Sequence, residues 1–392
     1  MSGTKKNSIY LSIIAISFIQ GMQFVVSPVL GDIQAHYPEK DVSLIQMLVT
    51  APSLLSMAVA LLSGWLALRI SKKRLLVFAA FLAGIVGFLP YLSDSFWLLL
   101  FSRTVYGVSL GIAATMNVAV VAEFFEGQER IRAMGVQSAG IGAGMVVVTA
   151  AAGFLGKNGF RASYPVNVIG FLCMAVLLVC LPETECRTAR ERGGLRLNGR
   201  VLGINLLTLL EICFITTFST NIAMHLSGVL AGNTAVSGLL SACFSAAQML
   251  IGLALGSLTR ITKHCTISVA FLCFTAGAVL LVLFPSNVAL LAIAALFCGF
   301  SQGIFIPSAS TEIANAVSPA ATALASATFT CAMNVGQLLS PVLLNPISGA
   351  VYGTVSTANV YSTSAAGAAL SAVGAFLWLR RSNPGNQLEK EI

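Results

Sequence analysis

Apolar runs of about 20 residues, separated by short segments that hold almost all of the charge, dominate this sequence. About 20 consecutive apolar residues are what an α-helix needs to cross the hydrocarbon core of a bilayer. Only 9% of the residues are Asp, Glu, Lys or Arg, whereas a soluble globular protein carries roughly a quarter. The sequence therefore predicts an all-α, polytopic membrane protein rather than a water-soluble enzyme.

The runs predict twelve membrane-spanning helices that use nearly the whole length, which leaves no room for a separate soluble domain. The first run follows Lys5 and Lys6 but exceeds the apolar region of a secretory signal and lacks a small-residue cleavage site, so we interpret it as a retained helix. The expected ranges are 9–30, 43–67, 75–92, 96–122, 134–156, 162–181, 201–224, 235–258, 265–284, 288–314, 320–344 and 358–379.

Lysines and arginines are distributed unevenly among the loops. Of the 22 Lys and Arg residues, Arg103 lies inside a predicted helix and eighteen fall on one side of the membrane. The three on the other side are Lys40, Lys157 and Arg161. Because basic loops stay in the cytoplasm, we expect both termini on the cytoplasmic side. We expect the protein to reside in the cell inner (cytoplasmic) membrane. The net charge of +8 arises from these loops, so we expect contacts with membrane lipids and none with nucleic acid.

The sequence also repeats itself at a displacement of 192 residues. Gly107-Val-Ser-Leu-Gly111-Ile recurs as Gly299-Phe-Ser-Gln-Gly303-Ile, and Gly144 recurs as Gly336. An even number of spans in each half gives both copies the same orientation, so the repeat axis lies along the membrane normal. We therefore expect two pseudo-symmetric six-helix bundles, 1–182 and 201–392, joined by a cytoplasmic linker, 183–200.

Several loop and helix motifs resemble those of the major facilitator superfamily, and the resemblance covers nearly the whole chain. The segment from Gly64 to Arg74 is similar to that family's loop between helices 2 and 3, and Arg103 with Gly107 and Gly111 to its helix 4 motif. Further similar segments are Glu123–Gly135, Gly159–Asn167 and Leu181–Thr184. The resemblance implies a transporter that works by alternating access.

Two positions depart from the family pattern. Leu68 stands where the loop motif usually has an acidic residue, which leaves the usual charged brace of the cytoplasmic gate in doubt. Val148-Thr149 replaces the Gly-Pro associated with proton-driven drug antiporters, although Ser340-Pro341 occupies the corresponding place in the second half. The gate residues that we predict from the motifs and from their position near the cytoplasmic side are Gly64, Arg69, Lys73, Arg74, Arg130 and Glu312.

Other motif matches carry no function here. Both G-x-S-x-G segments lie inside long apolar helices, whereas a nucleophile elbow needs a strand, a tight turn and a helix. We interpret them as small-residue spacing that lets helices approach closely. The sequence has no Walker A loop, so ATP is not expected to supply the energy directly. The nine cysteines show no metal spacing, and we expect neither a metal nor another cofactor.

Two charges lie inside predicted helices, where each costs at least about 2.5–3.5 kcal/mol. Glu211 falls about ten residues into its helix, roughly 15 Å at 1.5 Å per residue, and so near the membrane centre. It is predicted to bind a coupling proton or a cationic group; the alternatives are a static ion pair or a protonated, hydrogen-bonded carboxyl. Arg103 either contacts substrate and counters Glu211 across the bundles, or braces its own helix.

Uncharged polar residues recur on single faces of several helices at spacings of three, four and seven. Such faces are costly against lipid, so we expect them to look inward. The residues predicted to bind substrate are Arg103, Gln20, Gln23, Tyr106, Asn117, Gln248, Asn334 and Gln337.

These features predict a monomeric secondary transporter that moves a small, amphipathic organic molecule, with proton-coupled efflux as the leading direction. Uptake of a small organic anion held by Arg103 is one alternative. A membrane receptor with a transporter-like fold that binds without translocating is another.

Overall fold

The computed structural model describes residues 3–67, 69–125, 127–183, 199–262, 265–317 and 322–381. In these ranges the regular structure is entirely helical, and twelve stretches are long and apolar enough to cross a membrane. The predicted fold class is therefore confirmed, with all twelve predicted runs inside or overlapping these stretches. Leu68 and most of the predicted linker, 184–198, lie outside the described ranges.

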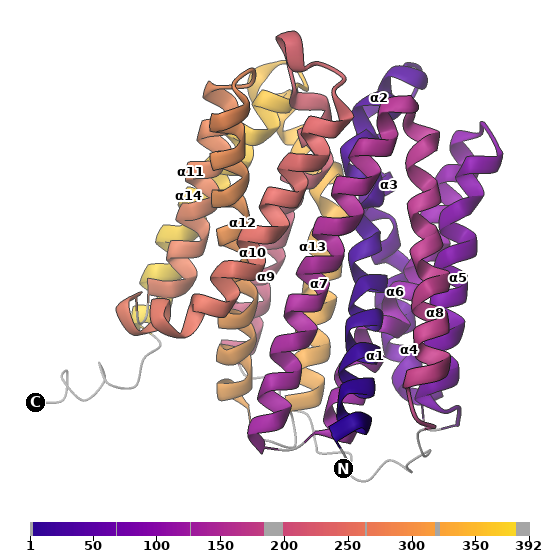
Figure 1. Cartoon of the computed structure of the whole chain (residues 1–392). Coiled ribbons are helices and arrows are strands. Elements are labelled where there is room, and N and C mark those ends of the chain that lie inside the picture. The colour runs from indigo at the N-terminus through magenta and orange to yellow at the C-terminus, as the bar shows by residue number, and fades with distance from the viewer. Residues whose placement is uncertain are drawn as a thin grey trace, which may run out of the picture. The chain divides into compact units, whose positions relative to one another are not determined.

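Contacts between Cα atoms divide the chain into two compact units, which are described separately below (Figure 1). The first contains residues 1–190 together with 219–246, and the second contains 191–218 together with 247–392. Two helices, α9 (Gly199–His225) and α10 (Thr234–Thr262), therefore contribute to both units. The two bundles predicted from the sequence, 1–182 and 201–392, are bounded by the linker and not by these contacts, and they stay a prediction.

The first unit is built from helices packed on one another along their length. In it α1 packs on α6, α7 and α8, and α6 also packs on α4 and α5. Its elements are α1 (Gly3–Gly21), η1 (Met22–Val29), α2 (Leu30–His36), α3 (Val42–Thr50), α4 (Pro52–Leu66), α5 (Lys72–Leu92), α6 (Phe96–Phe124), α7 (Gly127–Leu155), η2 (Gly156–Asn158), η3 (Phe160–Val168) and α8 (Ile169–Cys180), with η4 (Gly228–Leu230) between α9 and α10.

Prolines interrupt the first two spans of this unit. Proline has no N–H, so the carbonyl four residues before it loses its helical partner. Pro52 follows the break between α3 and α4 and leaves the Leu48 carbonyl in that position. Pro28 lies within the 3₁₀ segment η1, which joins α1 to α2. Backbone carbonyls are thereby made available in the membrane interior, where they need another donor.

The second unit packs α11 (Thr266–Leu283) against α12 (Val288–Ala316) and α14 (Thr357–Arg381), with α13 (Thr322–Tyr352) against α12 and α14. Small residues on α13 allow the middle of α9, around Leu209 and Cys213, to approach it closely. A Cβ on Gly336 would lie 2.6 Å from the Leu209 carbonyl oxygen. Ser340 also donates to the Cys213 carbonyl at 2.7 Å. These contacts fix the face of α9 that carries Glu211.

The sequence repeat is reproduced as a repeated backbone contact. In the first unit a Cβ on Gly111 would lie 2.6 Å from the Ser56 carbonyl oxygen. In the second a Cβ on Gly303 would lie 2.5 Å from the Gln248 carbonyl oxygen. Both members of this pair are displaced by 192 residues. Glycine at these positions is therefore required by close helix packing, as expected from the G-x-S-x-G segments.

The last part of α9 and the first part of α10, on either side of the loop between them, belong to the first unit. Ser27 donates to the Ser219 carbonyl at 2.5 Å, and Gln46 donates to the Asn221 side chain at 2.8 Å. Ser237 donates to the Pro28 carbonyl, on the 3₁₀ segment η1, at 2.5 Å. A Cβ on Gly153 would lie 2.7 Å from the Cα of Gly238. These contacts, which we name the outer contact, lie on the side predicted to face away from the cytoplasm.

Candidate functional site

Among the described residues, each unit buries one Asp, Glu, Lys or Arg side chain inside a helix. In the first unit Arg103 on α6 is 1% exposed. Its Nε donates to the Leu48 carbonyl at 3.0 Å, and its Nη2 donates to the Gln23 carbonyl. The Leu48 carbonyl is the one that Pro52 leaves without a helical donor. Arg103 therefore braces the two broken spans, which is a wider structural role than bracing α6 alone.

The guanidinium of Arg103 is incompletely paired despite these bonds. Among the described residues its Nη1 has no hydrogen-bond partner, and no ion pair includes Arg103. The Tyr106 ring lies with its centroid 5.0 Å from the guanidinium carbon, a distance suited to a cation–π contact. A buried arginine with one open nitrogen and no carboxylate offers a binding position for an anion or a carbonyl group.

The other predicted residues of the first unit fall into two groups. Gln23 and Tyr106 lie with Arg103: the Gln23 amide donates to the Val49 carbonyl at 3.5 Å, and the Tyr106 hydroxyl donates to the carbonyl of Ile19. Gln20 lies near the end of α1, three residues before Gln23. Its Nε2 has no partner among the described atoms.

Asn117 belongs to a separate polar group. It lies fourteen residues after Arg103 on α6, roughly 21 Å along the helix. Its Nδ2 donates to Ser17 at 3.0 Å, and Ser17 donates to the Gln137 carbonyl at 3.1 Å. The structure therefore does not bring Asn117 together with the group around Arg103.

In the second unit the buried charge is Glu211, on α9. Glu211 is only 2% exposed. Ser301 on α12 donates to Oε1 at 3.4 Å, while Oε2 has no hydrogen-bond partner in the described part of the chain. No ion pair of the described residues includes Glu211. One weak donor does not compensate a buried carboxylate, so this group can take up a proton or a cation.

Gln248 lies near the same stretch of α12, because its backbone packs against Gly303, two residues from Ser301. Its Oε1 is buried without a partner in the described ranges. Asn334 on α13 donates to the Thr330 carbonyl of its own helix at 2.9 Å, and Gln337 is half-buried one turn later. The sequence interpretation missed Ser301 as a polar partner, although the serine stood in the repeated segment that was assigned to packing.

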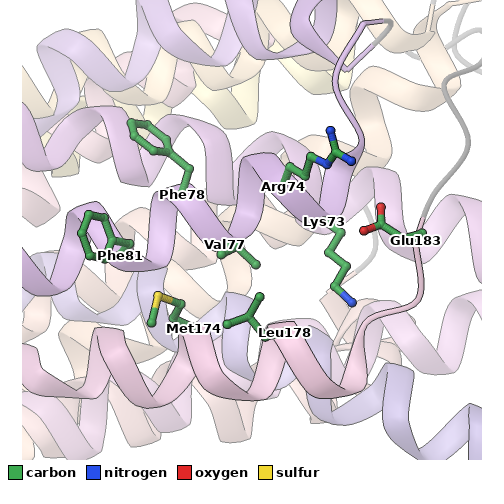
Figure 2. A pocket seen from close by; sticks show the side chains of 8 residues that line it. All are labelled: Lys73, Arg74, Val77, Phe78, Phe81, Met174, Leu178 and Glu183. Carbon is green, nitrogen blue, oxygen red and sulfur yellow. The ribbon is translucent and has the colours of Figure 1, made fainter.

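The predicted gate residues are not gathered in one place. Glu312 pairs with Arg200 at 2.7 Å in the second unit. Lys73 and Arg74 lie on the first turn of α5 and line a cavity between α5 and α8 (Figure 2). Arg69 is exposed, Gly64 lies in the last turn of α4, and the Arg130 side chain lies outside the described part. Among the described residues, the ion pair that joins α5 to α6 is Lys72 with Glu123; both lie in the motif segments, but neither is among the predicted gate residues.

A further polar cluster lies where the first unit's loops meet, outside the spans. His36 Nε2 lies 3.0 Å from Asp94 Oδ1, and the Tyr37 hydroxyl donates to the same oxygen at 2.8 Å. The Tyr37 hydrogen bond, followed by His36, holds the pKa of Asp94 below its usual value. Burial, reinforced by Asp94, raises the pKa of Tyr37 to about 12. The cluster ties α2 to the loop between α5 and α6.

Comparison with known proteins places this arrangement of helices in a family. The sequence profile described as Major Facilitator Superfamily matches residues 9–202 and 204–392. No curated protein sequence matches the chain. The match covers both halves of the repeat, with a break of one residue between them.

Solved structures with the same fold are transporters of low sequence identity. The nucleoside transporter NupG, in a variant form, is 13% identical with a TM-score of 0.74 over 95% of this chain and 99% of that one. A bacterial homologue of the human lysosomal transporter Spinster, inward-facing and unoccupied, is 16% identical with a TM-score of 0.67 over 97% and 95%. A POT family transporter in complex with 5-aminolevulinic acid is 8% identical with a TM-score of 0.77 over 96% of each chain. These likenesses establish the fold.

Proposed function

The chain belongs to the Major Facilitator Superfamily, and we propose that it is a secondary transporter that exports a small amphipathic organic molecule by exchange for protons at Glu211. Its family and fold are those of transporters rather than of enzymes. The finer steps of substrate, direction and coupling are argued below from the polar groups of each unit.

The environment of Glu211 carries the coupling proposal. A carboxylate buried with one long hydrogen bond and one open oxygen is expensive, typically several kcal/mol. A carboxyl that exchanges its proton for a cationic or polar substrate group avoids that cost in both states, because it is either protonated or paired with the substrate. Of the two structural alternatives for Glu211, the static ion pair finds no support among the ion pairs of the described residues.

The sequence repeat supports a role for both buried charges. Glu211 stands 192 residues after Ile19, whose carbonyl receives the Tyr106 hydroxyl beside Arg103. The position of Glu211 in its half of the repeat is thus equivalent to one beside Arg103 in the other half. We therefore assign Glu211, Gln248 and the open Nη1 of Arg103 to substrate and proton handling, with apolar side chains supplying most of the remaining contact.

The outer contact supports alternating access as the mechanism. Residues 219–246 pack on the rest of the first unit through the Ser27, Gln46 and Ser237 hydrogen bonds. Opening toward the outside requires these contacts to separate, and opening toward the cytoplasm leaves them intact. A transporter needs two such states of similar free energy, with substrate and protons biasing the balance.

The test is transport by the full chain in proteoliposomes with an imposed pH gradient and a panel of amphipathic cations and organic anions. A tenfold proton gradient supplies about 1.4 kcal/mol per proton, or tenfold accumulation. Glu211→Gln should abolish uphill accumulation while leaving downhill exchange, and Glu39→Gln, an exposed carboxyl, should retain both. A Glu211→Gln protein that still accumulates substrate from the pH gradient refutes coupling at Glu211.

Uptake of an organic anion is the second candidate, favoured by the open Nη1 of Arg103. In that case anions, and not cations, accumulate inside the vesicle with inward protons. A receptor that does not translocate would bind members of the panel without any flux in either variant. The same assay therefore separates all three functions.

A further inference from the structure

Two hydrogen-bond donors in the first unit are buried and have no partner among the described residues. One is Nη1 of Arg103 on α6, and the other is the hydroxyl of Tyr164 on η3. Both residues are 1% exposed. A buried donor without an acceptor is costly, and more so when it is charged. Two such donors close together indicate an acceptor that neither segment supplies.

The two donors lie in the same part of the first unit. The described groups that act electrostatically on the Arg103 guanidinium are the Tyr106 and Tyr164 hydroxyls, and the guanidinium acts in turn on Tyr164. Arg103 is the eighth residue of α6, and Tyr164 is the fifth of η3. Both therefore lie roughly 8–11 Å along their segments, at 1.5 Å per α-helical and 2.0 Å per 3₁₀ residue. Both segments start on the side predicted to face away from the cytoplasm.

Asn167 fixes the position of Tyr164. Its Nδ2 donates to the Gly87 carbonyl of α5 at 3.0 Å and to the Tyr164 carbonyl at 2.9 Å. A side chain at position 87 would collide with this amide, since a Cβ there would lie 2.5 Å from the Asn167 Cγ. The backbone of η3 is thus tied to α5 by contacts that leave the Tyr164 hydroxyl uncommitted.

The open edge of the Arg103 guanidinium is suited to an anion. Its Nε and Nη2 donate to the Leu48 and Gln23 carbonyls, and the Tyr106 ring covers one face. Guanidinium N–H groups point outward in the plane of the group, so Nη1 is the edge that is left. All three of these neighbours are neutral, and no ion pair of the described residues includes Arg103. Its positive charge therefore has no counterion in the part of the chain that the structure describes.

We propose that Arg103 Nη1 and the Tyr164 hydroxyl form a binding site for one small monovalent anion, with chloride as the occupant. One anion accepts from both donors at once and neutralises the guanidinium. A water molecule would satisfy the donors but leave the buried charge unbalanced, which is the larger cost. One positive charge and one hydroxyl suit a monovalent ion, and a halide suits residues that are both 1% exposed better than an organic anion does.

The site deepens the assignment of Nη1 to substrate handling, and its consequence for transport rests on that assignment. While chloride is bound, Arg103 offers no net charge to an organic anion, so an anionic substrate group must displace the chloride. A cationic substrate need not displace it. Chloride binding itself does not depend on proton coupling at Glu211.

The experiment is equilibrium dialysis of the purified full chain in detergent against radiolabelled chloride, with gluconate as the replacing anion at constant ionic strength. We expect saturable binding of one chloride per chain, with competition by bromide and none by phosphate. Tyr164→Phe keeps the ring and removes the donor, so it should weaken chloride binding by at least about tenfold. Chloride should raise the melting temperature of the unmodified protein, because it binds only the folded state, and this rise should be lost in Tyr164→Phe.

Tyr361→Phe, which alters a fully buried tyrosine of the second unit, is the matched control and should bind chloride as the unmodified protein does. Glu211→Gln should also retain the site, so failure of the anion site and failure of proton coupling give different results. Two results overturn the proposal: no saturable chloride binding by the unmodified protein, and equal chloride affinity in Tyr164→Phe. Tighter binding of formate than of chloride would overturn the choice of a halide and identify a carboxylate site instead.

Discussion

Adding a methyl group at Gly153 should open the outer contact. A Cβ there would lie 2.5 Å from the Thr234 carbonyl oxygen and 2.7 Å from the Cα of Gly238, both backbone atoms that cannot rotate away. Overpacking of this kind costs typically about 1–3 kcal/mol. Because the cost applies only while the two segments touch, Gly153→Ala should shift the balance toward the outward-open state, by roughly 30-fold for about 2 kcal/mol.

The assay uses Ser27→Cys as a reporter beneath the contact, since Ser27 is 1% exposed and donates to the Ser219 carbonyl. A membrane-impermeant thiol reagent applied to intact cells labels position 27 only when the contact opens. The labelling rate should rise about 10- to 100-fold in the Gly153→Ala background. Protein without the added cysteine provides the background from native thiols.

Gly135→Ala is the matched control, because it is the same substitution on the same helix and its Cβ would meet nothing within 4 Å. Both variants gain the same helix propensity, so only the contact differs. Equal labelling rates in the two variants, at equal protein in the membrane, would refute the reasoning. An increase seen only in inverted vesicles would show instead that this end faces the cytoplasm and that the predicted orientation is wrong.

Two further predictions concern individual polar groups. Arg103→Lys should lower the apparent melting temperature in detergent, because lysine cannot serve both the Leu48 and Gln23 carbonyls and each bond to a charged group contributes about 1.5–3 kcal/mol; an unchanged melting temperature would contradict the bracing role. Asp94→Asn should lower stability slightly at neutral pH, by about 0.2–1 kcal/mol for an exposed cluster. The pKa of Asp94 lies below its ordinary value of 3.8 in the fold, so its contribution is present above that value and is lost as pH falls through the lower folded pKa. The melting-temperature difference between Asp94→Asn and the unmodified protein should therefore vanish in strong acid, and a difference that persists there would exclude ionisation as its cause.

Local patterns in the sequence were sufficient for the spans, the repeat and the family. Hydropathy over about 20 residues reflects the thickness of the bilayer and needs no partner segment. The glycines at 111 and 303 were recognisable as packing positions because the two halves repeat the same spacing. Burial of Glu211 and Arg103 also followed from the sequence, since a charge inside an apolar run must face inward.

The partners of these groups were decided by tertiary structure. Arg103 meets the Leu48 carbonyl because Pro52, about fifty residues earlier in the chain, breaks a neighbouring helix at the same depth. Ser301 meets Glu211 because close glycine and serine contacts set the rotation of α9 against its neighbours. The cavity between α5 and α8 exists where the close contact of Gly84 with Gly170 gives way to larger side chains. Each of these depends on the rotation and separation of helices distant in sequence, and those quantities are set by packing between helices rather than by the periodicity within one.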